Sequence, residues 1–557
     1  MKKLFLTFFC LFFALTGFAE KLPDNMYFKA MKDEMDRSLK KLRRKGVPKL
    51  FSITYKLENL QLAPTIKGSF GKLYPLSTRD EKLSAYVVVS VGSAQKDSLG
   101  FKHGSYSSRY AYAPEYETDI AKSYDGIRQA LWYLTDEGYV FAADLYQQKQ
   151  AYERTKQLAE KKNAPDVVLS KQAHFVEEIS ALPDYDEKKI KDWVKEVSAL
   201  GKDYDFLEQF VVEVSPVKRD TYYLNSWGGF YQVSEPAVQV QFLAQLRNKD
   251  GFKQSYRNEF WFSSIHEDMY TQMQKEAKTF LEELEGLYQA VKPEEYTGPV
   301  LLRPQAAGKF VYNLLGENVQ NIKPLMSANQ QEDPTAGKFR KLGLRVMAPG
   351  ITVYDNPLAR YVPNTNIPLG GFMPVDDEGV AAEKRTLLEG GHLQQLPRTM
   401  RPLTDQIPSN GHARMMHRSF ARERLTNLQV QPHTTLSEEE LEQKLLERCR
   451  ELGLPYGYIL YDFPEENGGV VSRAMRIYTD SERREMVYGL RLSNLTTRAL
   501  RDIMAAGEQT RSIWLDTDSV FKGLPTQSIS SPSLLVDEIE FIPTDQKPDK
   551  KPFVPKP

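Results

Sequence analysis

The sequence is poor in cysteine and histidine, and it carries no excess of charge of either sign. Two cysteines and seven histidines occur in 557 residues, and 74 Lys and Arg residues balance 74 Asp and Glu residues. The balanced charge argues against nucleic acid as a partner, because affinity for phosphate backbones comes largely from clustered Lys and Arg. The scarcity of cysteine excludes a disulfide scaffold, and the scarcity of histidine leaves little material for a metal centre.

Long apolar runs are also lacking, except at the N-terminus. Residues 1–19 combine a positively charged start, a charge-free apolar run from Leu4 to Phe18, and small residues at Gly17 and Ala19. This is the pattern of a signal peptide, and the run is shorter than the roughly 18 to 20 residues that span a bilayer. We therefore expect cleavage and export to the periplasm or the medium, with no membrane span in the mature chain. Cleavage would leave Cys449 as the one remaining cysteine.

The hydrophobic periodicity predicts an α+β protein of two domains. We expect an N-terminal α+β domain over residues 20–298, a β-rich C-terminal domain with few helices over 299–542, and a disordered tail rich in Pro and Lys over 543–557. Helices are predicted at residues 23–46, 123–162, 187–200, 266–291, from 304 and from 437 to about 452, and strands at 51–57, 83–91, 210–217 and 238–242.

Two local details sharpen these elements. Asp24 is expected to cap the first helix, and Ser437 with Glu440 has the spacing of a capping box. Along the strand at 238–242, Val and Phe alternate with glutamines, which predicts one apolar and one polar face.

An acidic segment is the first candidate site. Asp376, Asp377 and Glu378 precede Gly379. Three adjacent carboxylates could bind a hard cation or a substrate amine. The same residues are also typical of a polar turn with Gly379 at positive φ, and this is the favoured interpretation.

The histidines give no zinc motif. His266-Glu267 begins like a zinc-peptidase helix, but Tyr270 stands where the second histidine would be, so a helix start is expected. His412 and His417 lie five residues apart and would not share a helix face. Cys449 falls on the apolar side of the helix that begins at Ser437, and we expect a buried thiol.

Several segments of the second half resemble those of the TldD/PmbA family. The acidic segment and the strand pair after it are similar to one family segment, residues 409–414 to its Asn-Ala-Arg loop, and residues 424–428 to its Thr-Asn strand. Residues 531–536 are similar to its closing strand. The resemblance covers residues 299 to about 541.

The resemblance implies two domains that pair into a shell with an inner cavity. Active members are zinc peptidases that degrade unstructured peptides, with a His-Glu-x-x-x-His helix and a cysteine near the C-terminus. The matching positions here are Tyr312, Asn313 and Glu317, and no cysteine follows Cys449. These residues lack the imidazole and thiolate ligands that hold Zn²⁺, and Asn313 cannot act as a base.

The resulting hypothesis is an exported, non-catalytic subunit that forms a peptide-binding cavity. It would pair as a homodimer or as a heterodimer with a metal-bearing paralogue, and it would need no cofactor. Asp376, Asp377, Glu378, His412 and Arg414 are its candidate binding residues. The alternative is an active metallopeptidase that degrades unfolded peptides at a relocated or degenerate metal site, with His412, His417 and the carboxylates of residues 376–378 as candidate ligands. A third hypothesis is an envelope structural protein that displays its tail and has no cavity.

Overall fold

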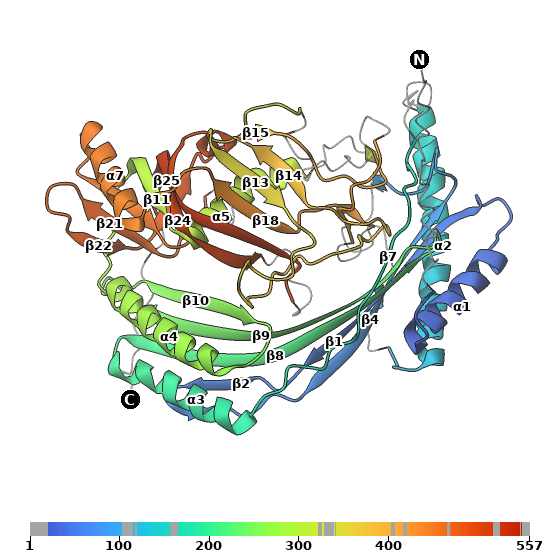
Figure 1. Ribbon diagram of the computed structural model, residues 1–557, viewed down its shortest axis with the longest axis horizontal. Coiled ribbons are helices and arrows are strands. Elements are labelled where there is room, and N and C mark those ends of the chain that lie inside the picture. The colour runs from blue at the N-terminus through green and yellow to red at the C-terminus, as the bar shows by residue number, and fades with distance from the viewer. Residues whose placement is uncertain are drawn as a thin grey trace, which may run out of the picture.

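The computed structural model describes the chain from residue 21 to residue 547 with several gaps. The described residues are 21–102, 115–116, 120–155, 165–320, 326–327, 339, 341–402, 407–415, 420–464, 468–515, 524–545 and 547. The predicted leader, His417 and most of the predicted tail lie outside them. Within them the fold is α+β, as predicted, and Figure 1 shows two sheets with helices packed on them.

The first sheet belongs to the N-terminal half of the chain. Nine strands of the described chain form it, and its main path is β10-β9-β8-β1-β4-β6. The bounds are β1 Leu50–Leu62, β4 Asp80–Val91, β6 Glu115–Tyr116, β8 Leu207–Asn225, β9 Phe230–Arg247 and β10 Lys253–Phe262, with β2 Ile66–Ser69, β3 Lys72–Leu73 and β7 His174–Val176 attached. β9 and β10 pair antiparallel and form a hairpin whose turn lies at residues 248–251.

Four helices cover the outer side of this sheet. They are α1 Met26–Lys41, α2 Tyr124–Thr155, α3 Glu187–Ala199 and α4 Glu267–Tyr288. The first two pack on β1 and β4, and the last two pack on β8 and β9. Figure 1 shows the long strands β8 and β9 curving beneath the second sheet, with α3 and α4 on the outer side of the curve.

Apolar and polar residues alternate along β9, and this alternation determines which side chains lie on each face of the first sheet. Val238, Val240 and Phe242 are fully buried and join the core with α3 and α4. Gln239 and Gln241, between them, point to the opposite, concave side. Alternating apolar and polar residues produce this arrangement, because successive side chains of a strand point to opposite faces of the sheet.

The second sheet belongs to the C-terminal half. Twelve strands of the described chain form it, with β25 at its centre. Its path runs through β15 His392–Leu393, β14 Arg385–Glu389, β13 Ile351–Asp355, β18 Asn427–Pro432, β25 Gln527–Pro543, β11 Tyr296–Leu302, β19 Tyr456–Leu460, β21 Ala474–Tyr478 and β22 Arg484–Val487, with β20 Val470–Val471, β23 Leu490–Ser493 and β24 Ile503–Leu515 attached. Two small pairs lie outside both sheets, β5 Phe101–Lys102 with β12 Met326–Ser327, and β16 Ala413–Arg414 with β17 Arg422–Glu423. The predicted domain boundary at 298/299 falls within β11.

The central strands of this sheet are buried on both faces. Leu301 and Leu535 pack against α7 Glu438–Glu451, and Val300 and Leu534 join the larger core on the other face. Helix α5, Pro304–Val311, lies on that second face. Continuous apolar runs are expected where a strand has cover on both sides.

The helix ends agree with one of the two predicted caps. The capping box at the start of α7 is confirmed, and Cys449 is fully buried there. The cap predicted at Asp24 is wrong, because the side chain of the next residue, Asn25, accepts the hydrogen bond from Phe28 N. Among the described residues, no helix is both long and apolar enough to span a bilayer.

Candidate functional site

A cavity of about 1610 Å³ lies between the concave side of the first sheet and the second sheet. We call it the inter-sheet cavity. Its floor is made by polar side chains of β8 and β9, such as Gln239 and Gln241, and consecutive residues of β10 border it. Helix α5 and residues Thr510–Leu515 of β24 close it from the other side.

Tyr312 and Asn313, which the sequence resemblance aligns with two of the family's metal-site positions, border this cavity. After α5 the chain makes a π-helical turn, Tyr312–Gly316, in place of the continuous α-helix that the sequence predicts, and then a short turn α6, Glu317–Val319. A π turn widens the helix by one residue and is often found at functional sites. Tyr312 and Asn313 both line the inter-sheet cavity. Glu317 lies in α6, and its side chain is outside the described part.

The two described side chains at these positions are already engaged within the protein. The Tyr312 hydroxyl donates to Oε1 of Gln527 at 2.7 Å, and Nδ2 of Asn313 donates to the carbonyl of Pro464 at 2.8 Å. Neither group is an imidazole, a thiolate or a carboxylate. These residues therefore do not fit a tetrahedral zinc site. Within the described ranges, no group of three His, Cys, Asp or Glu side chains has the arrangement to hold a metal ion.

The acidic segment forms a buried turn, and it does not line the inter-sheet cavity. Gly379 has φ +80°, so the predicted positive φ is confirmed. Asp376 is fully buried and accepts hydrogen bonds from the backbone N–H groups of Glu378, Val380 and Ala413 at 2.8 to 3.0 Å. The carboxylate thus organises the turn and ties it to β16.

The next two carboxylates join the turn to other parts of the chain. Asp377 accepts from the Tyr231 hydroxyl on β9 at 2.5 Å and from Met415 N at 2.7 Å, and Nζ of Lys56 on β1 lies 3.4 Å away. Glu378 accepts from the backbone N–H of Met400 at 2.5 Å. The segment therefore fastens the loops of the C-terminal half to the first sheet.

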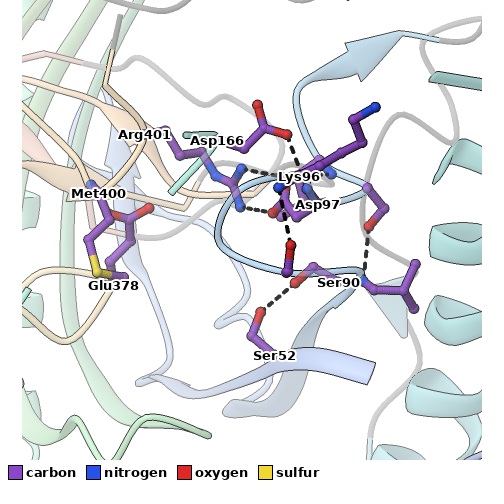
Figure 2. Close-up of polar contacts among 12 residues, drawn as sticks. Ser52, Ser90, Lys96, Asp97, Asp166, Glu378, Met400 and Arg401 are labelled. Carbon is purple, nitrogen blue, oxygen red and sulfur yellow. Dashed lines mark hydrogen bonds and ion pairs between the residues drawn. The ribbon is translucent and has the colours of Figure 1, made fainter. Parts of the chain in front are cut away.

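Beside Glu378, a buried ion pair makes a second junction between the two halves. Figure 2 shows Arg401 facing Asp97, which follows β4. Two guanidinium nitrogens of Arg401 donate to the two carboxylate oxygens of Asp97 at 3.1 and 2.7 Å. Nζ of Lys149 on α2 donates to Asp166 at 2.7 Å and to the carbonyls of Asp97 and Leu99. The bidentate geometry of the pair between Arg401 and Asp97 makes the interaction strong and fixes the relative orientation of the two side chains.

Burial raises the pKa of several carboxyls around this turn. It raises the pKa of Asp376 to about 7, against the pull of the three N–H donors, and that of Glu378 to about 8, with the neighbouring Asp376 adding to the shift. Burial likewise raises the pKa of Glu423 to about 7. These carboxyls are buried and hydrogen-bonded within the protein. We therefore interpret their raised pKa values as a property of the junction between the two halves of the chain.

The other two predicted binding residues are also buried near this turn. His412 is fully buried, its Nδ1 lies 2.9 Å from the carbonyl of Asn410, and its Nε2 lies 3.5 Å from Asp355. Burial lowers the pKa of His412. Arg414 donates to the carbonyl of Thr526 at 2.9 Å. Neither lines the inter-sheet cavity, and ligand binding by the five candidates stays a prediction.

Sequence patterns did not predict the residues that line the inter-sheet cavity. They come from strands and helices far apart in sequence, and include Trp261, Glu276, Lys309, Arg511 and Trp514. The alternating glutamines of β9 were the one available signal, since polar residues on the inner face of a long strand suggest a wet surface. Which strand of the second half faces them depends on the sheet order.

The second half of the chain is similar to a known protein domain. Residues 294–542 match the PmbA/TldA metallopeptidase C-terminal domain. A metalloprotease of Archaeoglobus fulgidus is 26% identical over 245 residues, which are 42% of this chain and 51% of that protein. The chain thus spans about half the length of this curated relative.

Solved structures show the same fold over most of the chain. A protein of Thermotoga maritima described as a candidate modulator of DNA gyrase has a TM-score of 0.57, with 16% identity, 92% of this chain and 100% of that chain covered. TldE from Thermococcus kodakarensis has a TM-score of 0.56 and 13% identity, with 92% and 100% covered. Residues 294–542 therefore form a C-terminal domain of the PmbA/TldA metallopeptidase type.

Proposed function

We propose that this chain is a non-catalytic, exported TldD/PmbA-family subunit whose inter-sheet cavity binds peptide. The observation that carries the proposal is the state of the metal positions. Tyr312 and Asn313 border the cavity, but both side chains are held by hydrogen bonds within the protein. The cavity is kept while the groups that would hold zinc and activate water are replaced.

The chemistry of these positions supports a binding role. A zinc peptidase needs three protein ligands, an open coordination position and a base for the attacking water. Asn313 presents an amide where the family has its carboxylate, and an amide does not accept a proton at neutral pH. Peptide hydrolysis would then require a metal-bearing partner subunit, and we propose that the chain pairs either with such a paralogue or with itself.

Two strand edges support a peptide as the ligand. In the described part of the chain, β10 pairs only with β9, and β24 pairs as a strand only with β25. The inter-sheet cavity is bordered by residues 255–257 and 259–262 of β10 and by residues 510–515 of β24. An edge that exposes unpaired N–H and C=O groups can bind an extended chain whatever its side chains are.

Export is the remaining part of the proposal, and it rests on residues 1–19. The apolar run and small residues near Ala19 are those of a cleaved leader. Expression of the full chain in a bacterium with an outer membrane, followed by fractionation and N-terminal sequencing, checks it. A mature start near residue 20 in the periplasm or medium is expected, and retention of an uncleaved chain in the cytoplasm would contradict it.

The binding function is tested with purified mature protein and a short unstructured peptide carrying a fluorophore. We expect saturable binding by anisotropy without cleavage, and no stoichiometric zinc by metal analysis. Ser255→Trp places a bulky ring in the cavity and should weaken binding, whereas Ser481→Trp, in an exposed turn, should not. Zinc-dependent cleavage that stops with a chelator would instead favour the relocated metallopeptidase.

A further inference from the structure

The inter-sheet cavity contains one arginine whose charge is left without a direct partner in the described structure. Four other cationic side chains line the cavity, and each is engaged. Arg257 pairs with Glu259, Lys309 with Asp462 at 2.7 Å, Arg473 with Glu283 at 2.9 Å, and Arg424 donates to Gln320 at 2.8 Å. For Arg511, the described residues provide no ion pair and no hydrogen bond to its guanidinium. The guanidinium lies over the ring of Phe260 on β10, with 5.3 Å between the guanidinium carbon and the ring centroid.

The position of Arg511 on β24 directs it to the part of the cavity near α5. Side chains alternate along a strand, so Arg511 shares a face with Ile513. Ile513 packs beside Gly308 of α5, where an added Cβ would lie 3.4 Å from its Cδ1. Tyr312 and Asn313 follow directly after α5. The guanidinium therefore lies on the same side of the sheet as the family's metal positions.

The surroundings of Arg511 favour an added negative charge. The side chain is only partly exposed, and its pKa is lowered, mainly by burial and also by the neighbouring Arg473. Glu276 and Glu283 oppose this effect from beyond direct contact. An arginine stays charged in proteins, and a partly dehydrated guanidinium without a hydrogen-bonded anion is unfavourable. A carboxylate would satisfy it with two parallel hydrogen bonds.

We propose that Arg511 is the receptor for a carboxylate of the peptide that enters the inter-sheet cavity. This inference rests on the proposed function, because it assumes that a peptide is the ligand. The carboxylate belongs either to the C-terminus of the peptide or to an Asp or Glu side chain. A singly charged carboxylate suits the site better than a phosphate dianion, because Glu276 and Glu283 limit the local positive charge.

The test compares three forms of one unstructured peptide without acidic residues: a free C-terminal acid, its C-terminal amide, and an amide with one internal Glu. We expect the free acid to bind about 10-fold or more tightly than the amide, since hydrogen bonds to charged groups are among the strong ones. The Glu-containing amide shows whether a side-chain carboxylate can replace the terminus. Equal affinity of all three forms for the unmodified protein would overturn the proposal.

Substitutions connect this preference to Arg511. Arg511→Gln should abolish the preference for the acid, and Arg511→Lys should keep part of it. Arg483→Gln, an arginine of the same half that is outside the cavity lining, should leave it unchanged. Because Arg511 has no direct charge partner to lose among the described residues, Arg511→Gln should unfold at the same urea concentration as the parent or a higher one. A preference that survives in well-folded Arg511→Gln would also overturn the proposal.

A smaller probe separates this inference from the proposed function. N-acetylphenylalanine carries one carboxylate and no peptide chain, and N-acetylphenylalanine amide is its neutral control. Arg511-dependent binding of the acid alone, without binding of any peptide, would support the carboxylate site and contradict the peptide-binding function. Peptide binding without a preference for the acid would support the peptide-binding function and contradict the carboxylate site.

Discussion

The hydroxyl of Tyr312, the residue that the sequence resemblance aligns with the family's first histidine, lies 2.7 Å from Oε1 of Gln527. Gln527 in turn donates from Nε2 to the carbonyl of Leu425 at 2.7 Å. Both side chains are buried. The π turn after α5 is thus tied to the first residue of β25, and the wall of the inter-sheet cavity is held by a short polar chain.

Removing the Tyr312 hydroxyl should destabilise the protein. Tyr312→Phe leaves a buried acceptor on Gln527 without its donor, and such a loss costs about 1 to 3 kcal/mol. Urea unfolding followed by circular dichroism measures it. Tyr361→Phe is the matched control, because Tyr361 is 42% exposed and should change the unfolding free energy little. Equal stability of Tyr312→Phe and the parent would show that the hydrogen bond is not formed.

Breaking the pair between Asp97 and Arg401 should weaken the junction between the two halves of the chain. Arg401→Met leaves the buried Asp97 carboxylate without its bidentate partner, and we expect a loss of about 3 to 5 kcal/mol. Lys149, 3.8 Å from the same carboxylate, would offset part of it. Arg498→Met removes an exposed pair with Asp502 and should cost less than about 1 kcal/mol. Similar losses in the two variants would contradict this view of the junction.

The stability of the protein should fall as pH rises from about 5 to 8. The folded-state pKa of Glu378 is about 8, above its ordinary value of 4.5. Between these values the folded protein holds a proton that the unfolded chain releases, so the contribution is complete below the unfolded pKa and is lost as pH rises through the folded pKa. Asp376 and Glu423 act in the same direction.

Glu378→Gln tests how much of this pH dependence of stability is due to the Glu378 carboxyl. The amide mimics the protonated form, so the variant should lose less stability over the same pH range. The difference in slope should be at most about 1.4 kcal/mol per pH unit. Urea midpoints measured from pH 5 to 8 give the slopes. Glu482→Gln, at an exposed turn, should keep the parent's slope, and an unchanged slope in Glu378→Gln would contradict the raised pKa.

Sequence patterns predicted the elements of this fold better than its site. Alternation along β9 and the capping box of α7 depend on neighbouring residues, and both are confirmed. Asn25 took the cap expected of Asp24 because both residue types cap helices well, and only the backbone path chooses between them. Arg511 was missed for a different reason. Its lack of a partner depends on strands β10 and β24 coming together, and the sequence contains no local trace of that order.

A stacked pair of tryptophans offers a direct reporter for the inter-sheet cavity. The rings of Trp261 on β10 and Trp514 on β24 lie 4.3 Å apart and are tilted by only 7°, and both line the cavity. Trp514 Nε1 also donates to the carbonyl of Pro368 at 2.7 Å. A peptide that lies between β10 and β24 must change the surroundings of this pair, since the two rings connect the strands.

We therefore expect the intrinsic tryptophan emission to shift when peptide binds. Trp514→Phe should lose most of the shift, whereas Trp132→Phe should keep it, because Trp132 is 47% exposed on α2 and outside the cavity lining. Aromatic pairs contribute about 0.5 to 1.5 kcal/mol beyond their buried area, so Trp514→Phe should also lower the unfolding free energy modestly. A full shift in the double variant Trp261→Phe, Trp514→Phe would place the bound peptide elsewhere on the protein.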